Sequence, residues 1–230
     1  MFPPYVRDYD YPQAKRDGDG PAQFVDGNPA FAWLDSRALF VLLRHWRPRR
    51  IVEVGSGHSS LLMADVNRRF LGRSAEIRCI EPYPPAFLAS APDGIAEVLP
   101  WRVQDVPLDA FTGLAAGDVL FVDSSHVSKT GSDVNHLFFE VIPRLAAGVR
   151  IHFHDVFLPF DYPRDWVLGM GLYWNEQYLL RALLTMTPAF RVLFGSTYAS
   201  VCCAEENAAA LSLPPGSVYG GSSFWIEKTV

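Results

Sequence analysis

Short apolar runs alternate along this chain with longer segments in which apolar residues recur every three or four positions. The short runs predict seven β-strands, at residues 51–54, 77–80, 97–103, 119–122, 150–153, 191–194 and 222–226. The longer segments predict helices within 29–46 and at 60–70, 85–89, 107–114, 132–145 and 176–186. Strands that alternate with helices pair in parallel through right-handed crossovers, which indicates an α/β protein.

The last two predicted strands depart from this alternation. Only an Ala-rich segment and a Pro/Gly/Ser-rich loop separate them, so they are free to pair antiparallel at one edge. The predicted fold is therefore Rossmann-like and doubly wound, with a mostly parallel seven-stranded sheet, a terminal antiparallel hairpin and an N-terminal helical cap. We expect a single domain over residues 1–230, with an arm and cap helix in 1–46 and the core in 50–230.

Composition narrows the class of protein. With 230 residues, 49% of them hydrophobic and 20% charged, the chain is suited to one large globular α/β domain. A net charge of -5 argues against a nucleic-acid-binding surface spread over the whole chain. The three cysteines lack metal-ligand spacing, and neither a signal peptide nor an apolar stretch of about 18 residues is present. We expect a cytoplasmic protein that acts without nucleic acid or membrane, and self-association is left open.

In a parallel sheet, ligands bind at the carboxyl ends of the strands, so the residues that follow each strand matter most. Gly55-Ser56-Gly57 follows the first strand and permits a tight turn close to a ligand, before a helix whose first N–H groups are free. A dinucleotide site would have a third glycine where this chain has Ser60. A tight turn without a ligand is the alternative interpretation.

The second and third strands are followed by groups that suit a nucleoside. Glu81 can accept both hydroxyls of a ribose, and Tyr83 can lie against the sugar or base. Gln104 and Asp105 can bond an adenine edge, although Asp105 is equally suited to cap a helix.

The fourth and fifth strands end in the most reactive residues. Asp123 and His126 follow the fourth strand, and His154 and Asp155 follow the fifth. Because these strands are expected to be neighbours, the four side chains should surround one crevice. Buried ionisable groups are costly unless they are paired, hydrated or ligand-bound, so this grouping favours a functional site.

This ordered set of motifs resembles the class I S-adenosylmethionine (SAM)-dependent methyltransferases, in the branch with Glu-Val-Gly-Ser-Gly, Asp-x-x-His and His-Asp motifs. The resemblance covers most of residues 28–228. The matching stretches are IVEVGSGHSS (51–60), CIEPYP (79–84), VQDVPL (103–108), FVDSSHVSKTGSDV (121–134), IHFHDVFLPFDYP (151–163) and GGSSFWIEK (220–228).

The resemblance implies a role for each matching position. It places Gly55, Ser56 and Gly57 against the amino-acid part of SAM, with Glu53 positioning their loop or the ammonium group. Residues 28–46 would cap the acceptor site, which His126, His154 and Asp155 would face. The remaining implied cofactor contacts are Ser59, Glu81, Pro82, Gln104, Asp105, Asp123 and Ser124.

The implied reaction moves a methyl group from SAM to a small-molecule acceptor and releases S-adenosylhomocysteine. An oxygen acceptor is favoured, because a histidine with an ordinary pKa near ~6.5 suits removal of its proton at neutral pH. The base would be His154 or His126, oriented by Asp155 or Asp123. Catechol-type relatives hold magnesium at similar places, which implies a divalent metal at Asp123, His154 and Asp155, although histidine suits magnesium poorly.

Three alternatives remain open on the sequence. The first is a hydroxylase-like relative on the same fold, with iron held by the histidine and the two carboxylates. The second is a SAM- or nucleoside-binding module without catalysis. The third is an NAD-dependent enzyme, which Ser60 disfavours.

Overall fold

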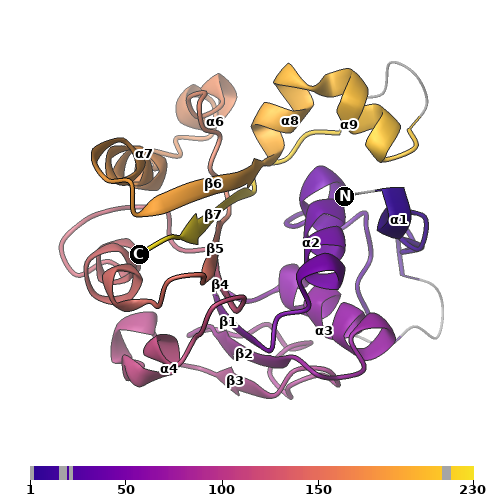
Figure 1. Cartoon of the computed structure of the whole chain (residues 1–230), viewed down its shortest axis with the longest axis horizontal. Helices are drawn as coiled ribbons and strands as arrows, with labels where there is room; N and C mark the ends of the chain where they lie inside the picture. Colours follow the sequence, from indigo (N-terminus) through magenta and orange to yellow (C-terminus); the bar gives the residue numbers. More distant parts are fainter. Residues whose placement is uncertain (1–2, 16–19, 21–22, 214–218) are drawn as a thin grey trace.

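The computed structural model describes residues 3–15, 20, 23–213 and 219–230, and it contains a seven-stranded sheet in the order β3-β2-β1-β4-β5-β7-β6 (Figure 1). The first five strands are parallel, and β7 runs antiparallel to both of its neighbours. This arrangement confirms the predicted mostly parallel, Rossmann-like sheet with an antiparallel hairpin. The strands are β1 Arg50–Val54, β2 Glu76–Ile80, β3 Glu97–Leu99, β4 Val119–Val122, β5 Arg150–Phe153, β6 Phe190–Gly195 and β7 Phe224–Lys228.

Helices cover both faces of this sheet (Figure 1). Helices α2 (Trp33–Trp46) and α3 (His58–Phe70) share one apolar cluster with Ile51, Val119 and Trp225. The opposite cluster joins Val52 and Val122 to α4 (Asp109–Thr112), α5 (Asp133–His136) and α7 (Glu176–Met186). The remaining helices are α1 (Pro3–Val6), α6 (Arg164–Leu168), α8 (Ser196–Cys202) and α9 (Ala204–Ala210).

Alternate residues of the central strands therefore enter different cores. In β1, Val52 and Val54 join one cluster and Ile51 joins the other. All three are nearly inaccessible, with 1–4% of their surface exposed. A strand buried on both faces reads as a continuous apolar run, which is why the sequence located β1 and β4 accurately.

Several predicted elements differ from the structure. The third strand ends at Leu99, because Pro100 follows it, and residues 103–105 form a short 3-10 helix (η1) instead. The helix predicted at 85–89 is a set of turns. The helix predicted at 132–145 is divided into α5, a π-helical turn (η2, Leu137–Val141) and a 3-10 turn (η3, Ile142–Arg144) that contains Pro143. Helices α6, α8 and α9 lie in segments for which no helix was expected.

The last strand lies inside the sheet and not at its edge. β7 pairs with β5 through Phe224 and Phe153 and with β6 through Phe224 and Gly195. Ser222 and Ser223, which precede β7, consequently lie beside the carboxyl end of β5. This insertion brings the end of the chain to the edge at which the sequence predicts the functional site. None of the described helices is both long enough and apolar enough to cross a lipid bilayer.

Candidate functional site

A cavity of about 440 Å³ opens at the carboxyl ends of β1, β2 and β4. Six of the predicted cofactor residues line it: Gly55, Glu81, Pro82, Gln104, Asp123 and Ser124. Its volume lies within the range of small-molecule sites in proteins, roughly 300–1,000 Å³. The topology therefore brings residues from three separate strand ends to one binding-sized space, as expected for a doubly wound sheet.

The polar side chains of this cavity are held by backbone contacts. The Glu81 carboxylate accepts a hydrogen bond from the Tyr83 N–H at 2.9 Å. The Gln104 amide donates to the Gly131 carbonyl at 3.0 Å. Asp105 lies outside this cavity, where its two carboxylate oxygens bind the exposed Arg102 guanidinium at 2.7 and 2.9 Å. Shortening of the third strand removes Asp105 from the position that the sequence analysis gave it.

Gly55 and Gly57 have different structural constraints. Gly55 has a φ of +81°, and a Cβ atom on it would lie 1.6 Å from the Asp123 carbonyl oxygen. Only glycine permits this approach of the first loop to the end of β4. A Cβ on Gly57 would meet no atom within 4 Å, and the φ of Gly57 is -167°, outside the left-handed region that favours glycine. Protein packing thus explains Gly55 and leaves Gly57 facing open space.

Glu53 lies beneath this loop and is fully buried. Its carboxylate accepts hydrogen bonds from the Ser59 hydroxyl at 2.5 Å, from the Ser60 hydroxyl, and from the Cys79 thiol at 3.3 Å. Burial raises the pKa of Glu53 to about 7, although these donors oppose that change. Glu53 and Ser59 consequently fix the loop from behind, and neither lines the cavity.

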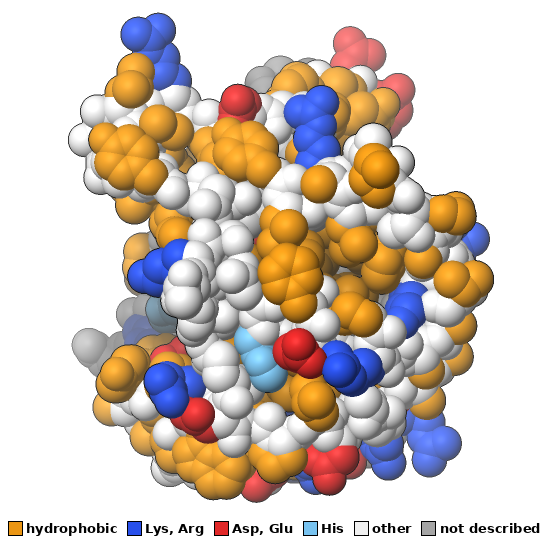
Figure 2. Space-filling model, turned by 90° about the vertical axis from the view of Figure 1, so that its left-hand side faces the viewer, with side chains coloured by type: hydrophobic (Ala, Val, Ile, Leu, Met, Phe, Trp, Pro, Cys, Tyr) orange, Lys and Arg blue, Asp and Glu red, His pale blue; other side chains and the backbone are white. Residues whose placement is uncertain are grey.

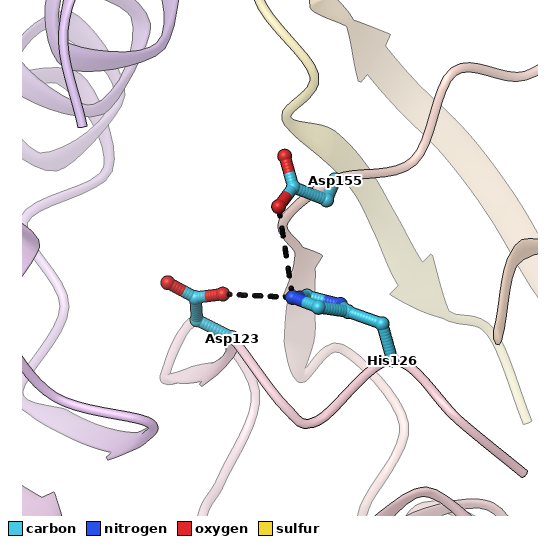
Figure 3. Close-up of side chains that lie close together, drawn as sticks. All are labelled: Asp123, His126 and Asp155. Carbon is cyan, nitrogen blue, oxygen red and sulfur yellow. Dashed lines mark ion pairs between the residues drawn. The ribbon is translucent and has the colours of Figure 1, made fainter. Parts of the chain in front are cut away.

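Beside the cavity, Asp123, His126 and Asp155 converge (Figure 3). The His126 Nε2 atom lies 3.4 Å from Asp123 Oδ1 and 3.6 Å from Asp155 Oδ2. One ligand atom from each residue lies within 4.8 Å of the others. His126 and Asp155 both have positive φ values, 60° and 56°, a strained backbone for these residues that is typical of functional sites.

The other ring nitrogen of His126 contacts an acid from a distant helix. Glu176, the first residue of α7, places Oε2 3.0 Å from His126 Nδ1 and also accepts a hydrogen bond from the Ser124 hydroxyl at 2.8 Å. Burial opposes a charge on His126, but the hydrogen bonds with Asp123 and Glu176 outweigh it and raise the pKa of His126 to about 9.

His154 lies behind this cluster. Its Nδ1 is 3.6 Å from both Asp123 and Asp155, and its Nε2 is 3.6 Å from Asp35 on α2. Burial opposes its charge, but these carboxylates, Asp123 above all, hold the pKa of His154 well above its usual value. In the reverse direction, His154 and His126 lower the pKa of Asp123, although partial burial of its carboxylate opposes them.

Asp35 links α2, through hydrogen bonds, to the segment that precedes β7. Its carboxylate accepts hydrogen bonds from the backbone N–H groups of Ser222 and Ser223, each at 2.9 Å. The Ser222 hydroxyl donates in turn to Asp155 at 2.7 Å. Only the first turn of α2 reaches the site, since the rest of that helix packs on α3 and the sheet.

The complete cluster has more acids than bases. It holds four carboxyl groups, on Asp35, Asp123, Asp155 and Glu176, and two imidazoles, on His126 and His154. Two imidazoles can balance at most two of the four carboxylates. The excess of negative potential in a buried setting favours a cation at this position.

Sequence reasoning found the four residues on strand ends and missed Asp35, Glu176 and Ser222. Asp35 and Glu176 stand in the first turns of helices, where acids are common for other reasons, so their spacing carried no signal. The one feature of the sequence that could have indicated Asp35 and Glu176 is that each is an acid within an apolar helical pattern. The structure also brings His126, and not His154, into the three-residue group suited to a metal.

Comparisons with known proteins identify a methyltransferase domain within the chain. Residues 52–156 match the family model described as a methyltransferase domain. An uncharacterized protein from Archaeoglobus fulgidus is 41% identical over 134 residues, which make up 55% of this chain and 59% of that protein. This chain thus matches little more than half the length of that relative.

This chain is also similar to solved structures of methyltransferases. The O-methyltransferase TomG from Streptomyces achromogenes, solved with SAM, has a TM-score of 0.52 and 18% identity, over 89% of this chain and 84% of its own. The methyltransferase PaMTH1 from Podospora anserina, solved with S-adenosylhomocysteine, has a TM-score of 0.48 and 22% identity, over 85% and 78% of the two chains. At 18% identity, the similarity to TomG is one of fold.

Proposed function

We propose that this chain, in which residues 52–156 match a methyltransferase-domain model, is a class I SAM-dependent methyltransferase that transfers a methyl group from SAM to an oxygen of a small-molecule acceptor. The observation that carries this proposal is the position of Asp123, which lines the 440 Å³ cavity and also belongs to the cluster with His126 and Asp155. A donor in the cavity and an acceptor at the cluster would meet at this residue. Such alignment is the main contribution that a protein makes to a displacement reaction.

The cavity residues fit SAM. When bound, SAM supplies a methyl group that is already activated by its sulfonium charge. The Glu81 carboxylate, at the end of β2, is placed to accept the hydroxyls of a ribose, and the backbone at Gly55 allows close approach at the opposite wall. The excess of carboxylates around Asp123 favours the cationic end of the molecule. These three features support the proposed binding of the sugar, the tail and the charge of the cofactor.

His126 is the best candidate for the base. Glu176 contacts its Nδ1 at 3.0 Å and fixes the ring, so that Nε2 points into the cluster, where its contacts with Asp123 and Asp155 are long. This is the arrangement of a carboxylate-oriented histidine base. Because the pKa of His126 is about 9, the ring must lose its proton before it accepts one from the acceptor hydroxyl. The raised pKa of His154 favours its protonated form, which would position Asp35 and Asp123.

In an alternative arrangement, in which His126 is a metal ligand and not the base, Asp123, His126 and Asp155 would bind a divalent cation. Asp123 and Asp155 offer carboxylate oxygens and His126 offers a nitrogen, a mixed set better suited to manganese, cobalt, iron or zinc than to magnesium. A cation here would polarise the acceptor oxygen, and Glu176 would then orient a ligand histidine. The group contains only one histidine, which disfavours the two-histidine iron site of a hydroxylase.

Calorimetry with a matched pair of variants tests the proposal. S-adenosylhomocysteine should bind the wild type, and Glu81→Gln should weaken that binding by about tenfold or more, because a charged acceptor is lost from the cavity. Asp105→Asn, at an exposed carboxylate outside the cavity, should change affinity less than about twofold. Equal effects of the two variants, or no binding to the wild type, would contradict the proposed cofactor site.

A second measurement separates an enzyme from a binding module. After the cofactor is established, a panel of phenols, catechols and alcohols is incubated with SAM, and S-adenosylhomocysteine release is followed. His126→Gln should abolish turnover while the protein still binds S-adenosylhomocysteine. Turnover that is indifferent to His126 would remove it as the base. The small-molecule nature of the acceptor, the absence of nucleic-acid and membrane partners and the cytoplasmic location remain predictions from the sequence.

A further inference from the structure

A second and larger cleft lies away from the cofactor cavity. It measures about 710 Å³ and is enclosed by α7, β6, α8 and the loop that follows β5. None of its lining residues lines the 440 Å³ cavity. Figure 2 views the side of the molecule on which α6 and α7 lie in Figure 1, and hydrophobic side chains gather over much of that face. The size of the cleft is again that of a small-molecule site.

The walls of this cleft are chiefly aliphatic and aromatic. They include Leu158, Leu184, Val192 and Phe224. Val192 keeps 52% of its surface exposed and Tyr198, on α8, keeps 47%. Apolar surface that stays exposed around a concave site typically marks a binding surface.

One cation stands in this apolar lining. Arg181, on α7, lines the cleft, and within the described residues no carboxylate lies at ion-pair distance from its guanidinium. The Arg181 charge interacts with Asp161. However, the Asp161 carboxylate already accepts hydrogen bonds from the Tyr162 N–H at 2.8 Å and from the Tyr178 hydroxyl. Thr185 donates its own hydroxyl to the Arg181 carbonyl at 2.7 Å. The guanidinium is therefore available to a ligand.

We propose that this cleft binds an amphipathic carboxylate, a small molecule with an apolar body and one anionic group. The body would cover Leu184, Val192 and Phe224, and Arg181 would hold the carboxylate, for which its planar fork of donors is suited. This site goes beyond the proposed methyl transfer, since it is built from different residues. The cleft and the cluster at Asp123 are connected along the backbone, because Leu158 follows Asp155 by three positions and Phe224 follows Ser222 by two.

Calorimetric titration with decanoate, below the concentration at which it forms micelles, tests this site. Decanoate should bind at least about threefold more tightly than decanol, and decylamine should bind more weakly than either, because Arg181 repels it. Arg181→Gln should remove the preference for decanoate over decanol. Arg164→Gln, on α6 and outside the cleft lining, should leave that preference intact. Equal binding of the three probes to the wild type would overturn the proposal.

Blocking the cleft supplies an independent test. Thr185 is exposed at the lining, so that Thr185→Trp should fold normally, as its circular dichroism and S-adenosylhomocysteine affinity would verify. This variant should lose decanoate and decanol binding together. Saturating S-adenosylhomocysteine should leave decanoate binding to the wild type in place. Displacement by S-adenosylhomocysteine, or undiminished binding to the blocked variant, would show that decanoate binds elsewhere.

Discussion

His126 and Glu176 meet at 3.0 Å through Nδ1 and Oε2, with 8% and 1% of their side-chain surfaces exposed. This pair connects the loop after β4 to the first residue of α7, across 50 positions of the chain. A second contact, from the Ser124 hydroxyl to the same carboxylate oxygen, belongs to the wall of the cofactor cavity. Glu176 therefore links the position of the candidate base to the shape of the proposed cofactor site.

Removing the charge of Glu176 should lower the pKa of His126. In metal-free wild-type protein, NMR titration of the imidazole resonances should give His126 a pKa of about 9. In Glu176→Gln the pKa should fall, because one of the two acids that favour the charged ring is lost. The imidazole resonance of His45, which is exposed on α2, is an internal control whose chemical shift at a fixed pH the substitution should not change. An unchanged His126 titration would mean that Asp123 alone governs the ring.

Glu53 should make stability depend on pH near neutrality. Its pKa in the folded protein, about 7, exceeds the usual 4.5, so its favourable contribution is present below pH 4.5 and is lost as the pH rises through 7. For a fully buried group this loss approaches about 3 kcal/mol. The free energy of unfolding, measured with urea at pH 5 and pH 8, should therefore rise for Glu53→Gln relative to the wild type at the higher pH. Glu205→Gln, on α9, controls for the simple loss of a carboxylate.

The two glycines of the first loop should respond differently to alanine. Gly55→Ala forces a Cβ into the Asp123 carbonyl at a positive φ, so we expect a severe loss of stability in thermal unfolding. Gly57→Ala should cost only about 1 kcal/mol, as for a helix cap, because the new methyl group meets open space. A loss of S-adenosylhomocysteine affinity in the folded Gly57→Ala protein would locate the cofactor tail at this loop. Unchanged affinity would place the tail elsewhere.

A metal at the cluster should depend on His126 more than on His154. Titration with Mn²⁺ or Co²⁺ should show affinity reduced about tenfold or more in His126→Gln, because a ligand is lost. His154→Gln should have a smaller effect, and His45→Gln none. A greater loss in His154→Gln would restore the ligand set that the sequence alone indicated. If the wild type binds neither ion, the cluster acts through its own acids and bases.

The strands and the residues at their ends were the features predicted most accurately from the sequence. β1, β4 and β5 are buried runs whose ends are marked by a sudden change to polar residues, so Asp123, His154 and Asp155 could be placed at one edge. Asp105 was misplaced relative to the cavity because a proline ends β3 early. Asp35 and Glu176 were missed because their helices pack from opposite faces of the sheet, and only tertiary packing brings their first turns together.

The insertion of β7 between β5 and β6 has a consequence for biosynthesis. The two strands that flank β7 are translated before it. Each lacks its β7 partner until residues 224–228 have left the ribosome. The hydrogen bonds that Asp35 and Asp155 accept from Ser222 and Ser223 likewise cannot form until these serines have been translated. Nascent chains arrested before residue 220 should therefore expose the open edges of β5 and β6 to chaperones and proteases. The candidate site would be completed only as the final strand enters the sheet.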